Sequence, residues 1–292
     1  MKVLKNYFYN AGYQLLVILV PLITTPYVNR VLGPYGIGVN TYTNTIIQYF
    51  VLFGSLGILL YGNRQIAYVR DNKYELSKQF WEIQIVHILG IVLASLIFTI
   101  YWFFIAKYRI FMLIQAVNLI AALFDISWFY QGLENFKITV LKNTIVKLIS
   151  IALIFLFVHS YKDVGIYIFI YSISTLFGNL TLWPSLRSSL IKIDFHDLTP
   201  WRHIPPSIAL FIPTVAVQIY QTFNKTLLGL FSGVSSSGYY FNSDTIIKML
   251  LYLVTAIGTV MLPHTAHAFA NGKTEHVKKC YNYQLMLLLV SL

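Results

Sequence analysis

The sequence predicts an all-α membrane protein, a polytopic helical bundle whose surroundings are the lipid bilayer rather than water. Of its 292 residues, 57% are hydrophobic and only 11% are charged, and the mean hydropathy is +0.67. Soluble domains carry about 25% charged residues, so this chain has too little polar surface for a water-soluble fold. The few charges are also spaced to leave long uncharged runs between them.

Five uncharged runs are each longer than the roughly 20 residues that a helix needs to cross the hydrocarbon core. They are bounded by Lys5 and Arg30, Arg30 and Arg64, Glu82 and Lys107, Asp163 and Arg187, and Lys248 and Lys273. Lipid cannot pair with an open sheet edge, so these runs indicate helices. The expected spans cover residues 8–29, 40–62, 82–105, 110–131, 143–160, 164–185, 206–229 and 239–263, with a ninth starting near Tyr281.

The distribution of positive charge predicts the orientation. If the N-terminus is cytosolic, most of the 21 Lys and Arg residues fall on the cytosolic side, as the positive-inside rule requires. The first apolar run is longer than the roughly 7–15 residues of a signal peptide, which predicts a retained span. We therefore expect a multi-pass protein of the cell membrane. The same distribution explains the net charge of +11 without nucleic acid as a partner.

Two stretches six spans apart resemble each other. YVNRVLG at residues 27–33 and FNKTLLG at residues 223–229 each contain Asn, then a cation, then Leu-Gly, and each precedes a Gly-rich turn. Chance is the alternative explanation, because Leu-Gly is common in membrane helices. The repeat predicts two homologous, pseudo-twofold related lobes of six helices each. We expect a first lobe at 1–186, a cytosolic linker at 187–205, and the start of a second lobe at 206–292.

The last apolar run, residues 281–292, is too short to cross a membrane, so we expect a longer parent protein. Cys280 is the only cysteine, which excludes an intrachain disulfide and a cysteine metal cluster. His264 and His267 have no third ligand nearby, so no metal site is expected. The sequence contains no nucleophile elbow, Walker motif or paired-carboxylate signature, and we expect neither an enzyme nor a bound cofactor.

Three stretches carry a family resemblance. They are PLITTPYVNRVLGPYGIG at 21–38, YGNRQIAYVRD at 61–71 and DISWFYQGLENFK at 125–137. With these motifs the chain resembles bacterial polysaccharide repeat-unit flippases of the Wzx type, within the multidrug/oligosaccharidyl-lipid/polysaccharide exporter superfamily. Many relatives have Asp where this chain has Asn224, so any ion coupling that uses that acid would differ here.

The resemblance implies a V-shaped pair of lobes in which spans 1, 2, 7 and 8 line a central cavity. It also implies the substrate, an oligosaccharide repeat unit linked to undecaprenyl pyrophosphate, destined for capsule, exopolysaccharide or O-antigen. The expected partners are that lipid-linked sugar, the bilayer and the polymerase and export machinery of the same pathway. Two alternatives remain open: a drug exporter of the same superfamily, and a membrane-embedded polysaccharide polymerase. The polymerase would need a sizeable extramembrane loop with catalytic residues.

A pyrophosphate headgroup requires cations in the cavity, since Arg and Lys are the side chains that bind phosphate. The candidate cavity cations are Arg30, Arg64, Lys225 and Lys248. Snorkelling to the lipid headgroups is the alternative for the first three. For Lys248 the alternative is an ion pair with Asp244, one helical turn away.

Asp125 and Lys147 lie at matching depths in neighbouring expected spans. They predict either a buried ion pair that fixes helix packing or a protonatable carboxylate for ion coupling. Pro21, Pro26 and Pro213 lie inside expected spans and predict helix kinks there. Broken helices at matching places in two halves point to a transport site, whereas isolated kinks are also tolerated in membrane helices.

Overall fold

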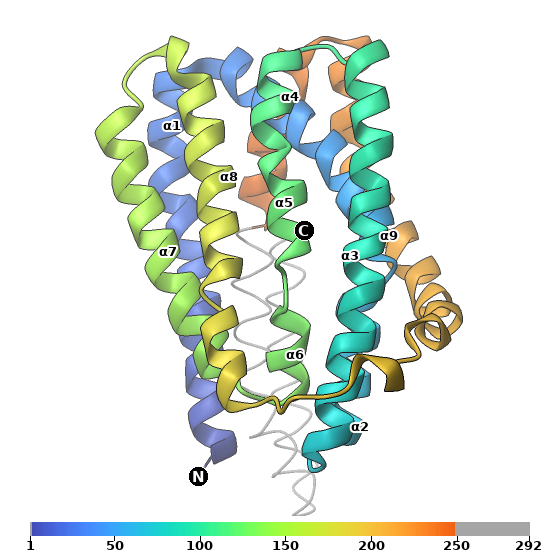
Figure 1. The fold of residues 1–292 in the computed structure, drawn as a ribbon. Coiled ribbons are helices and arrows are strands. Elements are labelled where there is room, and N and C mark those ends of the chain that lie inside the picture. The colour runs from blue at the N-terminus through green and yellow to red at the C-terminus, as the bar shows by residue number, and fades with distance from the viewer. Residues whose placement is uncertain (1, 249–292) are drawn as a thin grey trace, which may run out of the picture.

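A computed structural model describes the backbone of residues 2–248 and the side chains of residues 22–248 apart from 136, 137 and 195. This part of the chain is a bundle of helices without β-strands (Figure 1). Six of its segments are long and apolar enough to cross a membrane: Leu22–Val69, Lys73–Phe104, Arg109–Gly132, Ile138–Phe157, Tyr161–Ser188 and Pro200–Phe231. The predicted all-α, multi-pass membrane fold is therefore confirmed.

The α-helices are α1 (Lys2–Ser55), α2 (Ile58–Val69), α3 (Lys73–Phe104), α4 (Arg109–Gln115), α5 (Val117–Leu123), α6 (Ser127–Gly132), α7 (Phe136–Phe157), α8 (Val164–Leu180) and α9 (Ile204–Phe231). Short 3₁₀ turns are η1 (Tyr161–Asp163), η2 (Trp183–Ser188), η3 (Phe195–Asp197) and η4 (Pro200–His203). The backbone is helical again from 234 to 248. The expected ninth span, His264, His267 and Cys280 lie outside the described residues.

Helix α1 contains the first expected span and most of the second. Gly33 adopts φ 66° and ψ 177°, a conformation that side chains other than glycine rarely allow, and this residue divides α1 at a sharp kink. The chain rises from the N-terminus, turns near the upper end of the bundle in Figure 1, and returns to α2 at the lower end. The expected spans 8–29 and 40–62 are connected by residues 30–39, and Gly33 lies in this connection.

The second and fourth expected spans lie within the apolar segments Leu22–Val69 and Arg109–Gly132, and each is interrupted by a short break in the helix. The second breaks at Leu56 and Gly57, where both residues have positive φ. The Ser207 hydroxyl from α9 donates to the Leu56 carbonyl at this break. A neighbouring helix therefore supplies the hydrogen bond that the interrupted helix has lost.

The fourth expected span is divided into α4, α5 and α6, and its main break follows Leu123. Three side chains from other segments satisfy the carbonyls before this break: Asn179 Nδ2 donates to Ala121, Gln84 Nε2 to Leu123 and Trp183 Nε1 to Phe124, at 2.8, 3.0 and 2.9 Å. Backbone polar groups within a membrane need such partners. Side chains from other segments therefore stabilise this break in the folded bundle.

The two Gly-rich turns of the internal repeat pack against each other. A Cβ on Gly38 would lie 1.8 Å from the Val234 carbonyl oxygen, and one on Gly238 would lie 2.3 Å from the Pro34 carbonyl oxygen. Only glycine permits this approach. The start of the 234–248 helix is therefore held against the second half of α1, next to the Gly33 kink.

Apolar packing forms two clusters. One joins α1 to α4, α5, α7 and α8, and the other joins α2, α3, α6 and η2 around Phe80 and Trp128, whose rings stack with centroids 5.6 Å apart. Many large side chains of α3 and α7 face outward, including Phe103 and Phe104. In a soluble protein such a surface would be unstable, but it suits contact with lipid.

Candidate functional site

A polar cavity of about 240 Å³ lies between the second half of α1, α9 and the 234–248 helix. The α1 wall is a strip of amides and hydroxyls spaced so that they share one helical face. The opposite wall also carries amides and hydroxyls, together with two lysines. The lining residues are Asn40, Thr41, Asn44, Thr45, Gln48, Gln218, Gln221, Thr222, Lys225, Phe241 and Lys248.

The two lysines of this cavity share one carboxylate. Lys225 Nζ lies 2.8 Å and Lys248 Nζ 2.9 Å from Asp244 Oδ2. The predicted pairing of Lys248 with Asp244 is confirmed, and the structure adds Lys225 from α9 to the same acid. Two cations against one anion leave a net positive charge beside the cavity. Uncharged amides and hydroxyls next to this charge can bind an anion and the hydroxyl groups attached to it.

The other two candidate cations lie elsewhere. Arg30 is exposed and lines a separate cavity of about 680 Å³ with Tyr27, His159 and Tyr161. Arg64 is exposed on α2 and lines neither cavity. The structure therefore brings together Lys225 and Lys248 but not Arg30 or Arg64.

Asp125 lines a second cavity of about 240 Å³, together with His87 and Trp128. Its Oδ1 accepts a hydrogen bond of 2.9 Å from the Ser127 backbone and so caps the broken span. His87 Nδ1 and Trp128 Nε1 are buried, and among the described residues they have no hydrogen-bond partner. A bound water or ion is one way in which such buried polar atoms are satisfied.

The second cavity adjoins the first, because Gln48 and Gln218 line both. Lys147 is on α7, where its carbonyl accepts from the Ser150 hydroxyl at 2.7 Å. The ion pair of Asp125 with Lys147 stays a prediction. The structure associates Asp125 with His87 instead, a histidine that the sequence analysis did not select.

Helical backbone continues through all three prolines expected to kink their spans. Within α1 the residue with non-helical dihedral angles is Gly33, beyond both Pro21 and Pro26. Pro213 lies inside α9. A bend at each proline stays a prediction. The change of direction within α1 occurs at Gly33 instead.

A buried carboxylate that the sequence analysis missed lies in α3. Glu82 is fully buried and accepts from the Thr199 backbone and hydroxyl at 2.8 and 3.2 Å, and from Arg202 Nε and Nη2 at 3.0 and 2.7 Å. His203 Nε2 lies 2.7 Å from the same carboxylate, and the Tyr61 hydroxyl lies 2.7 Å from His203 Nδ1. We call Glu82, Thr199, Arg202, His203 and Tyr61 the Glu82 cluster.

The Glu82 cluster ties the segment before α9 to α2 and α3. An acid inside an apolar helix was the available signal, but its partners lie about 120 residues away in a polar loop. Sequence spacing therefore could not pair them. Both oxygens of the Glu82 carboxylate accept hydrogen bonds within the protein, so the cluster holds this segment against α2 and α3.

The family described as "Polysaccharide biosynthesis protein" matches residues 3–269, nearly the whole chain. The chain belongs to this family. Two relatives carry the name "Putative O-antigen transporter". The one from Escherichia coli K12 is 27% identical over 284 residues, covering 94% of this chain and 67% of the relative. The one from Shigella dysenteriae is 22% identical over 249 residues, covering 84% of this chain and 63% of the relative.

The chain thus spans about two thirds of the length of these relatives. No solved structure matches it. Membership of a polysaccharide biosynthesis family confirms the resemblance drawn from the three motifs. The names of both relatives describe transporters of O-antigen.

Proposed function

We propose that this protein is a flippase that moves an oligosaccharide repeat unit, linked to undecaprenyl pyrophosphate, across the cytoplasmic membrane. The observation that carries the proposal is the polar cavity with its surplus cation. An amide-rich surface suits sugar hydroxyls, and Lys225 and Lys248 suit the phosphates. The names of the two relatives support the same class of substrate.

In this proposal the helices up to residue 188 form one lobe and α9 begins a second. The close packing of Gly38 on Val234 brings the lobes together at one end, and the cavity lies beside that contact. The N-terminus is cytosolic, so the headgroup enters from that side and is released on the other. The lipid tail stays in the bilayer throughout, because its transfer into a polar cavity would be costly.

We further propose that His87 and Asp125 form the site of ion coupling. Their cavity shares Gln48 and Gln218 with the lysine cavity, so a proton or cation bound there lies next to the substrate. An ionisable residue within a membrane span has a cost of roughly 2.5–3.5 kcal/mol and is commonly kept for function. Asp125 lies at the break between α5 and α6, where the backbone can change conformation when an ion binds.

The test is transfer of the lipid-linked repeat unit in a strain that lacks its own flippase. The protein is expressed with its full natural length, and repeat units are measured on each face of the membrane. Restored outward transfer supports the flippase. If the protein is inserted and folded but transfers no repeat units while drug efflux rises, the drug-exporter function replaces the flippase proposal. Polymer formation by the purified protein would favour the polymerase instead.

A further inference from the structure

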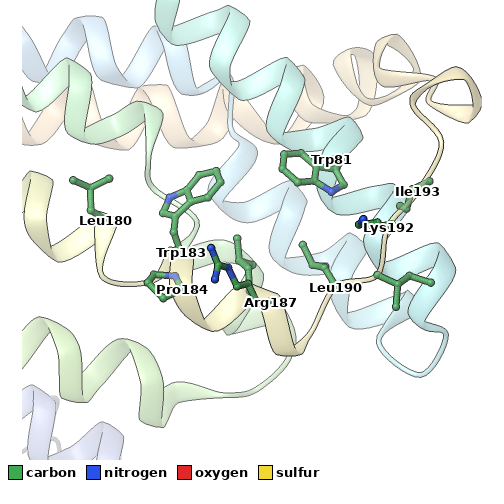
Figure 2. Close-up of a pocket in the computed structure, with 10 residues that line it drawn as sticks. Trp81, Leu180, Trp183, Pro184, Arg187, Leu190, Lys192 and Ile193 are labelled. Atoms are coloured by element: carbon green, nitrogen blue, oxygen red, sulfur yellow. The ribbon is translucent and has the colours of Figure 1, made fainter.

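A fourth cavity, of about 1010 Å³, lies on the bundle between α3, the end of α8 and the segment from η2 to Ile193 (Figure 2). Eight of its lining residues are apolar and two are basic. They are Trp81, Leu180, Trp183, Pro184, Leu186, Arg187, Leu190, Ile191, Lys192 and Ile193. None of them lines the two polar cavities described above.

Two basic side chains, those of Arg187 and Lys192, line this cavity and are exposed. Among the side chains that the structure describes, neither has a carboxylate partner. Figure 2 draws Arg187 and Lys192 on the same cavity as Trp81 and Trp183, so its lining combines two cations with two aromatic rings. This arrangement offers two positive charges to a ligand while its apolar part contacts the rings.

The walls of the cavity are held in place by bonds to the rest of the bundle. Trp183 Nε1 donates to the Phe124 carbonyl at 2.9 Å, and the Ile191 backbone donates to the Ser77 hydroxyl at 3.0 Å. Leu186 is buried. The cavity is therefore largely pre-formed, and a ligand would lose little binding energy to ordering the protein.

The chemistry of the lining selects the ligand. It contains no carboxylate, amide or hydroxyl side chain that could bind sugar hydroxyl groups. Arg and Lys bind phosphate, and Trp is the residue favoured where lipid headgroups meet acyl chains. Basic pockets between membrane helices are known to bind anionic lipid headgroups. Its volume also far exceeds the need of a free phosphate ion.

We infer that this cavity binds an anionic glycerophospholipid, with its phosphate on Arg187 and Lys192 and its acyl chains against the aromatic and aliphatic wall. The lipid would come from the leaflet at the lower end of Figure 1, where η2 and the N-terminus lie. The same segment continues to Thr199 and Arg202 of the Glu82 cluster. A bound lipid would thus hold the segment between the two proposed lobes against α3.

The test measures lipid binding and needs no transport. The 292-residue chain is purified in detergent and titrated with phosphatidylglycerol and with phosphatidylcholine, and bound lipid is counted by native mass spectrometry. We expect phosphatidylglycerol to bind at least about tenfold more tightly, a difference of about 1.4 kcal/mol. The variant Arg187→Gln with Lys192→Gln should lose this preference. Arg187→Lys should keep most of it, because the charge remains.

The matched control is Lys73→Gln with Lys78→Gln. It also removes two positive charges, near the N-terminal end of α3 where Trp81 lies, but neither lysine lines the cavity. Its preference should equal that of the wild type, and both variants should keep the wild-type unfolding temperature. Equal losses in the two variants, or no preference in the wild type, would overturn the inference. Displacement of the phospholipid by undecaprenyl phosphate at much lower concentration would assign the cavity to the substrate lipid, and displacement by inorganic phosphate would assign it to a free ion.

Discussion

Two carboxylates in this protein bind cations in different ways. Glu82 is fully buried, and five donors from three residues satisfy it. Asp244 is partly exposed, and among the residues that the structure describes its ion-pair partners are Lys225 and Lys248, which leaves one positive charge in surplus beside a cavity. A carboxylate whose hydrogen bonds are all made within the protein stabilises the structure. A carboxylate shared by two lysines leaves part of their positive charge free to bind a ligand. Burial alone would have ranked Glu82 first as a functional residue.

The largest expected effect comes from replacing the Glu82 carboxylate. Glu82→Gln replaces a buried carboxylate that accepts several hydrogen bonds with an amide that has one acceptor oxygen, and it should lower the free energy of unfolding by about 3 kcal/mol, because each hydrogen bond to a charged group contributes about 1.5–3 kcal/mol. Thermal unfolding of the purified protein measures this. Glu75→Gln, on the same helix but outside the cluster, should change the unfolding temperature little. Equal effects of the two substitutions would show that the Glu82 cluster does not hold the fold.

The second effect should be on transport, beyond the loss of stability that follows when Asp244 loses both of its lysine partners. Lys225→Ala with Lys248→Ala removes the cations of the polar cavity and should lower transfer of the lipid-linked sugar at least about tenfold, since hydrogen bonds to charged groups contribute about 1.5–3 kcal/mol. The transfer assay in the flippase-deficient strain measures it, with protein amounts matched. Lys73→Ala with Lys78→Ala is the control. Unchanged transfer in the cavity variant would refute the role of these lysines.

The third prediction separates the two acids directly. Asp244→Asn should cost about 1.5 kcal/mol of stability, about half the cost at Glu82, because Asp244 has fewer donors and is less buried. It also frees both lysines, so the substrate concentration for half-maximal transfer should fall. Chemical denaturation and a substrate titration measure the two quantities. A loss of stability as large as that of Glu82→Gln would remove the distinction drawn here.

The smallest effect should come from a change that keeps charge but alters shape. Arg202→Lys retains the cation beside Glu82 but loses one of the two hydrogen bonds from Nε and Nη2, so stability should fall by about 1 kcal/mol. Arg202→Ala should cost more than Arg202→Lys in the same unfolding experiment. If the two variants were equal, the geometry of the guanidinium would contribute nothing.

Composition and charge spacing alone determined the class of the protein. The chain has 11% charged residues and uncharged runs longer than a membrane span, which excludes a water-soluble fold. Because lipid offers no hydrogen bonds to backbone groups, these runs must form helices in a membrane bundle. Helical spacing also sufficed to pair Lys248 with Asp244, since residues four apart share a face. Short-range physics was enough for both conclusions.

Tertiary structure decided the rest. The breaks near Gly57 and Asp125 are stable because Ser207, Gln84 and Trp183 from other segments satisfy the exposed carbonyls. Likewise, Glu82 meets Arg202, and Arg30 and Arg64 are separated from the lysine cavity, through the packing of helices that are distant in sequence. Apolar helices follow from local composition. Which polar groups meet depends on contacts between different segments, such as Gln84 with Leu123 at 39 residues apart and Ser207 with Leu56 at 151, and no local pattern encodes those contacts.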